Sequence, residues 1–430
     1  MKSVGELLGR CLLAVGVERV YGRAVPGLPH VRGDENDALL RLLADGDGRL
    51  GPGPGCSFLA DGELRITSKP GARAKSVDVT DVADLPAAVA LAGDLARLSI
   101  DAGVVSLDLD LDAPVPPDVA PIAPAADPEA RPPLPPVDGP VVMLVGPGVL
   151  RARAERGLHS FADAAGIGVA NTWGAKGVFP WDSPHHMGTA GLQEQDFELL
   201  GFGDAAAILA SGLDPDESPF DRFASAPVQA VVPQLLSVPL AEHLAVPDRP
   251  AVENRLYERL AGIAQPGYVD DKLPLHPARA VADLRAVLPA RGVLAAQPGF
   301  AGLWVARTFP TTEPGSVIVP ATAPDGAAAA IACAAGRRGR PAIAVVDDPV
   351  DDITQAIIEH APRLGSHFTL DVWSLFGDMS SVDAHRHALE DARRTSGPGV
   401  TVIRTPVDVG DIRLLTEAAG SVVAWGGLAP

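Results

Sequence analysis

The sequence is poor in aromatic residues, cysteine and positive charge. Phe, Trp and Tyr make up only 4% of its 430 residues, whereas Ala, Gly and Pro are abundant, so we expect aliphatic cores. The three cysteines, Cys11, Cys56 and Cys333, lack CxxC spacing and fit a reducing cytoplasm better than a disulfide framework. With 35 Lys and Arg against 54 Asp and Glu, the formal net charge is −19, which argues against nucleic acid or an anionic membrane as a partner.

Long apolar runs are also missing. No run reaches the roughly 20 residues that a membrane-spanning helix requires. The apolar N-terminal stretch contains Glu6 and Arg10, while Leu7, Cys11 and Leu12 share one helical face. This pattern predicts an amphipathic helix rather than a signal peptide. We therefore expect a soluble cytoplasmic protein with no membrane partner.

Proline-rich stretches divide the chain, which is long enough for about two to four domains. Residues 114–140 hold eleven prolines and cannot form a helix or a central strand, so they predict an extended linker. A second linker, containing one short helix, is predicted at 246–274. The expected domains are therefore 1–113, 141–245 and 275–430.

Apolar runs and helical patterns alternate along the second and third segments, which is typical of parallel sheets covered by helices on both faces. The first segment begins with a helix and a strand and ends with a helix at 84–98 and a strand at 104–109, around an irregular, glycine-rich centre. The sequence thus predicts an α/β protein with three doubly wound parallel-sheet domains, the first one reduced. The expected strands of the other two segments are 141–145, 167–171, 206–211 and 228–233, then 293–297, 341–346, 367–374 and 399–404.

Several motifs resemble the thiamine diphosphate enzymes of the acetolactate synthase type. Residues 139–191 are similar to the central domain of that family, from the turn Gly146-Pro147-Gly148 through "AKGVFP" to "HHMGTAG". "GVERVYG" at 16–22 is similar to the start of its pyrimidine-binding domain, and 273–289 to the entry of its diphosphate-binding domain. The resemblance implies self-association as a homodimer or tetramer, for which we expect Leu303, Trp304 and Val305 to contribute surface.

The resemblance also locates a metal site, which appears here only in altered form. In the family, a strand ends in Gly-Asp-Gly, and that Asp and a later Asn hold the Mg²⁺ that binds the cofactor's diphosphate. Here the triplet is Asp347-Asp348-Pro349, so Asp348 is the vestigial metal candidate, while both glycines are missing and Pro349 offers no N–H. The Asn position falls at Trp373 or Ser374, and no Asn occurs from 350 to 430.

The sequence also lacks a glutamate at the position from which the family contacts the pyrimidine end of the cofactor. Glu35 comes too early and Glu63 too late to be the glutamate that protonates the aminopyrimidine ring in the family. We therefore expect no cofactor, assign no catalytic residue and leave the cofactor-binding residues unknown.

Three functions remain open from the sequence. The first is a divergent acetolactate-synthase-like homologue that has lost usual thiamine diphosphate and Mg²⁺ binding and acts as a non-catalytic binding or regulatory scaffold, or in undisclosed chemistry. The second is an active thiamine diphosphate-dependent 2-oxo acid decarboxylase or carboligase with an atypical site. The third is a nucleotide or metabolite sensor that binds a small molecule through its central domain.

Simpler interpretations compete with each candidate site. The acidic run at 347–352 is typical of a solvated loop in which Asp351 or Asp352 caps a helix. His185 and His186 are expected to be loop residues of the central domain. The turn "GPGVLR" follows a strand as nucleotide-binding turns do, but lacks the full GxGxxG pattern. His385 and His387 stand two apart on a predicted helix and therefore cannot share a face.

Overall fold

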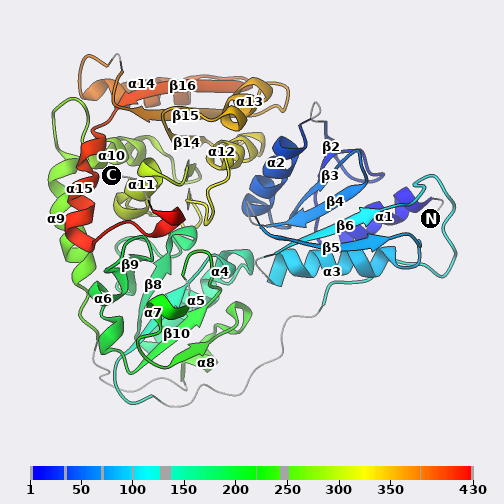
Figure 1. The fold of residues 1–430 in the computed structure, drawn as a ribbon, viewed down its shortest axis with the longest axis horizontal. Coiled ribbons are helices and arrows are strands. Elements are labelled where there is room, and N and C mark those ends of the chain that lie inside the picture. Colours follow the sequence, from blue (N-terminus) through cyan, green and yellow to red (C-terminus); the bar gives the residue numbers. More distant parts are fainter. Residues whose placement is uncertain are drawn as a thin grey trace.

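The computed structural model describes residues 3–32, 36–68, 72–98, 101–125, 137–218, 220–242, 251–377 and 379–427. These residues form three sheets, each with helices packed against it (Figure 1). The fold is therefore α/β, as predicted. Of the proline-rich stretch, 126–136 lie outside the described residues, and the described parts carry neither helix nor strand.

The first sheet is mixed rather than parallel. Its order is β2-β1-β3-β4-β6-β5, and β4 runs antiparallel to both of its neighbours. The reason is the short connection Leu59–Gly62, because a hairpin joins only antiparallel strands. This corrects the expectation of a doubly wound parallel sheet in this domain. The strands are β1 (Val20–Gly22), β2 (His30–Val31), β3 (Gly55–Phe58), β4 (Glu63–Thr67), β5 (Ala74–Val79) and β6 (Ala102–Leu107).

Three helices cover this sheet: α1 (Val4–Ala14), α2 (Asp37–Leu50) and α3 (Leu85–Leu98). The predicted amphipathic N-terminal helix is confirmed as α1. Helix α2 lies where we expected irregular chain. It begins because the side chain of Asn36 accepts a hydrogen bond from the Leu39 N–H at 3.1 Å. A Cβ on Gly46 would lie 3.0 Å from the Ala330 carbonyl oxygen, so this glycine lets α2 pack closely on the third domain.

The central sheet is parallel and has the order β11-β10-β7-β8-β9. The chain leaves β7 toward β8 and β9 and then returns to β10 on the other side, so the doubly wound prediction is confirmed here. The strands are β7 (Val141–Val145), β8 (Gly168–Thr172), β9 (His186–Ala190), β10 (Ala207–Ser211) and β11 (Val228–Ala230). The helices are α4 (Gly148–Arg151), α5 (Glu155–Ala165), η1 (Trp173–Ala175), α6 (Asp196–Leu199), η2 (Phe202–Asp204), α7 (Phe220–Phe223), η3 (Pro233–Leu235) and α8 (Val238–Glu242).

The third sheet is also parallel and doubly wound, with the order β13-β12-β14-β15-β16. Helix α9 (Arg255–Tyr268) leads into it from the stretch that we predicted as a linker. The strands are β12 (Val293–Ala296), β13 (Val317–Ile318), β14 (Ala342–Asp347), β15 (His367–Ser374) and β16 (Gly399–Pro406). The helices are α10 (Pro277–Val287), α11 (Phe300–Thr308), α12 (Ala327–Arg337), α13 (Asp352–His360), α14 (Asp383–Arg394), η4 (Val409–Asp411), α15 (Ile412–Ala419) and η5 (Ala424–Gly426).

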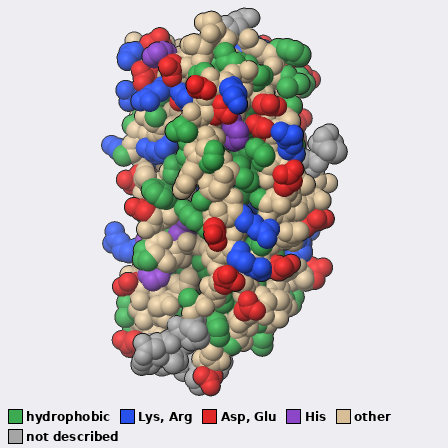
Figure 2. Space-filling model, turned by 90° about the vertical axis from the view of Figure 1, so that its left-hand side faces the viewer, with side chains coloured by type: hydrophobic (Ala, Val, Ile, Leu, Met, Phe, Trp, Pro, Cys, Tyr) green, Lys and Arg blue, Asp and Glu red, His purple; other side chains and the backbone are tan. Residues whose placement is uncertain are grey.

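The cores connect the domains. One buried cluster runs from the central sheet into the third domain, and another joins α2 to α12. Leu303, Trp304 and Val305 are buried in the first of these clusters, so the expectation that they contribute to an intersubunit surface is wrong. On the side where α9 and α15 lie, acidic and basic side chains are interspersed with apolar ones (Figure 2). Within the described residues, none of the helices has the length and apolar character needed to cross a bilayer.

Candidate functional site

Each doubly wound sheet has a switch point at its carboxyl edge, where the chain reverses direction across the sheet. In the central sheet it lies between β7 and β10, and in the third sheet between β12 and β14. Ligands of such sheets bind outside the carboxyl ends of the strands at this point. These two edges are therefore the candidate binding positions of the two sheets.

At the third sheet, Asp347 turns its side chain onto the N-terminus of α11. Its Oδ1 accepts a hydrogen bond from the Ala301 N–H at 2.9 Å. A Cβ at Gly299 would lie only 2.4 Å from this carboxylate, so the close approach requires glycine. Burial raises the pKa of Asp347 to about 6, although the N–H groups of Ala301 and Phe300 favour its charged form. A helix N-terminus is a ready anion site, and here the protein's own carboxylate occupies it.

The neighbouring helix N-terminus is filled in the same way. Gln297, directly after β12, accepts a hydrogen bond from the Ala328 N–H of α12 at 3.1 Å. Asp351 accepts one from the Gly326 N–H at 3.2 Å. Asp351 also caps α13, because its Oδ1 lies 2.7 Å from the Thr354 nitrogen. The cap interpretation of the acidic loop is confirmed for Asp351.

The metal candidate Asp348 points toward solvent. Its side chain is 43% exposed and lies 3.2 Å from Nη1 of Arg404. Trp373, at the expected Asn position, is buried and donates its indole N–H to Asp371 at 2.9 Å, while the Ser374 hydroxyl donates to a backbone carbonyl. Across the described parts of the chain, no group of three or more His, Cys, Asp or Glu gathers as metal ligands would. The donors at this edge do not fit Mg²⁺ bound to a diphosphate.

The candidate histidines have separate structural contacts. His385 is buried between Asp283 and Asp371, with ring nitrogens 3.2 and 3.1 Å from their carboxylates. Burial disfavours its imidazolium, but the two carboxylates outweigh this and raise its pKa to about 9. His387 is exposed, so the two do not share a face, as predicted. His185 contacts the carbonyl of Ile167, whereas His186 is the first residue of β9 rather than a loop residue.

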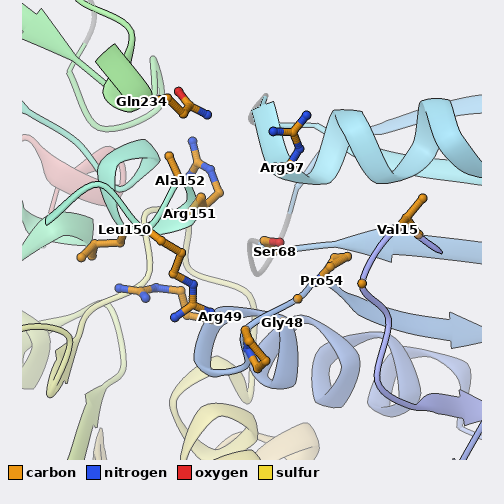
Figure 3. Close-up of a pocket in the computed structure, with 14 residues that line it drawn as sticks. Val15, Gly48, Arg49, Pro54, Ser68, Arg97, Leu150, Arg151, Ala152 and Gln234 are labelled. Atoms are coloured by element: carbon orange, nitrogen blue, oxygen red, sulfur yellow. The ribbon is translucent and has the colours of Figure 1, made fainter. Parts of the chain in front are cut away.

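The central switch point, by contrast, adjoins an open cavity of about 250 Å³ between the first and central domains. Figure 3 shows that Gly48, Arg49, Ser68 and Arg97 line it from the first domain, and Leu150, Arg151, Ala152 and Gln234 from the central domain. A smaller cavity of about 20 Å³ shares Arg49, Ser68 and Arg151 with it and reaches the loop after β13.

Four arginines line the larger cavity, and no Asp or Glu is among its described lining residues. Arg151 forms a buried bidentate ion pair with Asp214, with distances of 2.7 and 3.2 Å. Arg97 donates to the Ala125 carbonyl at 2.7 Å and to Asp94. Arg153 is exposed, and among the described residues it has no ion-pair partner. We refer to this space as the arginine-lined cavity.

Arg49 is the most unusual of the four. It stands in the last turn of α2, and its buried Nη2 has no hydrogen-bond partner among the described residues. Burial and then the neighbouring charge of Arg151 lower its pKa to about 10. Arg153 is also constrained, because its φ of 55° lies in the left-handed region that side chains rarely adopt. A basic side chain held with an unused buried donor is typical of an anion-binding site.

The sequence pointed to only one segment of this cavity. The turn "GPGVLR" resembled a nucleotide-binding turn without the full GxGxxG pattern, and it ends at Arg151, which lines the cavity together with Arg153. Arg49 and Arg97 were missed, because only the packing of the first domain against the central one brings them there. The run of arginines at 151, 153 and 156 was the one local signal available.

Comparisons with known proteins agree with this architecture. Residues 140–231 match the central domain of thiamine pyrophosphate enzymes. An acetolactate synthase of Mycobacterium avium is 29% identical over an alignment of 125 residues, and the match covers 23% of this chain and only 20% of that enzyme.

A solved structure is similar over nearly the whole chain. It is a protein from Mycobacterium smegmatis provisionally assigned as a thiamin diphosphate-dependent enzyme, with a TM-score of 0.66 and 16% identity, covering 95% of this chain and 99% of that one. At this identity the likeness establishes the fold alone. Residues 140–231 therefore form a central domain of the thiamine pyrophosphate enzyme type, and in sequence the likeness lies in this domain.

Proposed function

We propose that this chain is a ligand-binding member of the family that takes a phosphorylated small molecule, such as a nucleotide, in the arginine-lined cavity. It acts as a non-catalytic binding or regulatory scaffold. The observation that carries the proposal is Arg49, whose buried Nη2 lacks a partner within the described chain beside a cavity lined by three further arginines.

The energetics favour an anion at this position. A buried donor left without a partner costs about 1–3 kcal/mol, and a bound phosphate oxygen would remove that cost. Guanidinium groups match the geometry of phosphate through paired N–H donors. A cavity of about 250 Å³ has room for a diphosphate and a small attached group.

Side chains at the carboxyl edge of the third sheet occupy the positions where a diphosphate would bind. Asp347 lies on the α11 N-terminus, Gln297 and Asp351 on the α12 N-terminus, and Asp348 pairs with Arg404. A diphosphate at this edge would meet carboxylates instead of free N–H groups, and like charges a few ångströms apart near a surface repel by roughly 4 kcal/mol. We therefore propose that thiamine diphosphate and Mg²⁺ are not bound here in the family's manner.

Calorimetric titration with ADP and with inorganic pyrophosphate tests the proposal. We expect both to bind wild type and expect Arg49→Gln to weaken binding at least about tenfold. Arg41→Gln is the matched control, because Arg41 stands on the same helix but pairs with Glu63, away from the cavity. Wild type that binds neither probe, or Arg49→Gln that binds as wild type does, would overturn the proposal.

We further propose that the chain self-associates as a homodimer or tetramer, as members of this family typically do. Leu375 and Phe376 support this, because they stand at the carboxyl edge of the third sheet and Phe376 is 85% exposed. A second copy that covers this edge would bury both. Light scattering that gives a 44.3 kDa species at micromolar concentration would contradict self-association.

A further inference from the structure

A second cavity, of about 340 Å³, lies at the edge of the central sheet between β9 and α9. Among the residues that the structure describes, none lines both this cavity and the arginine-lined cavity. Leu260, Ala261 and Ala264 of α9 form an apolar wall, and Phe309 and Pro310 follow α11 at one end. We call it the β9–α9 cavity.

One of its two basic residues is already neutralised. Arg307 is buried and donates to the carboxylate of Asp196 at 2.5 Å, to Gln193 at 3.0 Å and to the Thr189 carbonyl at 2.7 Å. Every nitrogen of its guanidinium therefore has a partner. Arg307 therefore has a structural role in the lining of the cavity, and its guanidinium has no nitrogen left to bind a ligand.

Lys176 is the other basic residue, and it has no such partner. Its side chain is only 6% exposed and lines the cavity, yet no ion pair or side-chain hydrogen bond to its ammonium exists within the described residues. Burying a charge without a partner is costly, so such lysines are rare unless something binds them. Burial, and secondarily the charge of Arg307, lower the pKa of Lys176 to about 7.

His186 supplies a second polar group beside Lys176. Its Nδ1 is buried, and among the described residues it has no hydrogen-bond partner. Burial and the adjacent Lys176 lower the pKa of His186 to about 4, so the ring is neutral near pH 7. The hydroxyl of Tyr257 donates to the Trp181 carbonyl, and that of Tyr268 to the Thr308 carbonyl, so neither is free to donate to a ligand.

We propose that the β9–α9 cavity binds a small organic acid that has one carboxylate and an apolar body of a few carbons. The carboxylate would lie against the Lys176 ammonium with His186 beside it, and the apolar body against α9. The single ammonium of Lys176 balances the one negative charge of a carboxylate, whereas a phosphate group would bring more negative charge than this ammonium can balance. An inorganic anion has no apolar part that could pack against α9.

Carboxylate binding at Lys176 has a measurable proton linkage. A carboxylate favours the charged ammonium, so it raises the pKa of Lys176 and the protein takes up a proton when it binds. This uptake is expected near pH 8, where the free protein holds Lys176 mostly neutral. Calorimetry detects this proton uptake, because the measured heat of binding then changes with the ionisation heat of the buffer.

The experiment titrates the full chain with butyrate, hexanoate, octanoate and benzoate, and with hexanamide as the neutral analogue. We expect at least one of these acids to bind with proton uptake, and the amide to fail. Lys176→Met should weaken the binding at least about tenfold, and Lys176→Arg should keep binding but lose the proton uptake. Lys272→Met is the control, because Lys272 is exposed and outside the cavity.

A variant that fills the cavity tests the same proposal without changing its charge. Ala261→Phe should abolish acid binding and leave pyrophosphate binding at the arginine-lined cavity unchanged. The proposal is wrong if none of the acids binds wild type, if Lys176→Met binds them as wild type does, or if Ala261→Phe has no effect on them.

Discussion

The central and third domains have doubly wound parallel sheets of five strands each, but their carboxyl edges differ in charge and in access. At the central edge, arginines surround a cavity and Arg49 keeps an unused buried donor. At the third edge, Asp347, Gln297 and Asp351 occupy the N-termini of two helices. The same topology thus leaves one edge open to an anion and closes the other with the protein's own side chains. Strand order locates a possible site, but side chains decide whether it can be used.

The largest expected difference between the edges concerns two aspartates that follow strands, Asp214 after β10 and Asp348 after β14. Asp214→Ala leaves Arg151 buried without its carboxylate, which should destabilise the central domain by about 3 kcal/mol. Asp348→Ala breaks an exposed pair and should cost no more than about 1 kcal/mol. Urea denaturation of both variants measures the difference. Equal losses of unfolding free energy in the two variants would show that the aspartates at the two edges contribute equally to stability.

The pH dependence of stability sharpens the comparison at Asp347. Its pKa is raised on folding from 3.8 to about 6, so the protonated form favours the fold. This contribution is present below about pH 4 and is lost as the pH rises through about 6. Asp347→Asn keeps an oxygen for the Ala301 N–H and removes the charge, so near pH 7 it should be more stable than wild type by about 3 kcal/mol. The stability advantage of Asp347→Asn should vanish near pH 4. Melting temperatures of the variant and wild type between pH 4 and pH 7 measure this difference. A variant that is less stable than wild type near pH 7 would contradict the prediction.

A smaller effect is expected from Arg153, which lines the arginine-lined cavity from its exposed side. Arg153→Gln should weaken pyrophosphate binding about threefold to tenfold, and the loss should shrink as salt is added, because exposed charges are screened. Arg49→Gln should show the larger and less salt-dependent loss. Calorimetry at low and high salt separates the two, and the opposite order would show that Arg49 is not the main anion contact.

The sequence was most informative where a pattern is local. The apolar runs at 141–145, 341–346 and 367–374 correspond to β7, β14 and β15, because buried parallel strands are continuous apolar stretches. Helix α10 begins at Pro277, because proline is favoured at the first position of a helix. Helix α2 was missed because the glycines and aspartates of "ADGDG" are poor helix formers, and the reason for those glycines lies in its packing against α12 and β3.

The candidate sites were harder to predict, because they depend on contacts between distant segments. Asp348 was placed in a ligand position by the spacing of one loop, but spacing could not show that Asp347 reaches Ala301 or that Arg404 lies beside Asp348. Arg49 lies in a different domain from the turn "GPGVLR" that supplies Arg151, and no local signal marks it as part of the same cavity.

The most direct test of the contrast between the two edges is the Mg²⁺ dependence of binding. Wild type is titrated with ADP and with thiamine diphosphate at about 100 µM, a level that detects micromolar constants, each with and without Mg²⁺. We predict that ADP binds equally well in both conditions and that thiamine diphosphate shows no binding that requires Mg²⁺. Thiamine diphosphate binding that needs Mg²⁺ and is lost in Asp348→Asn would show that the acidic edge is a working metal site, and it would contradict this account.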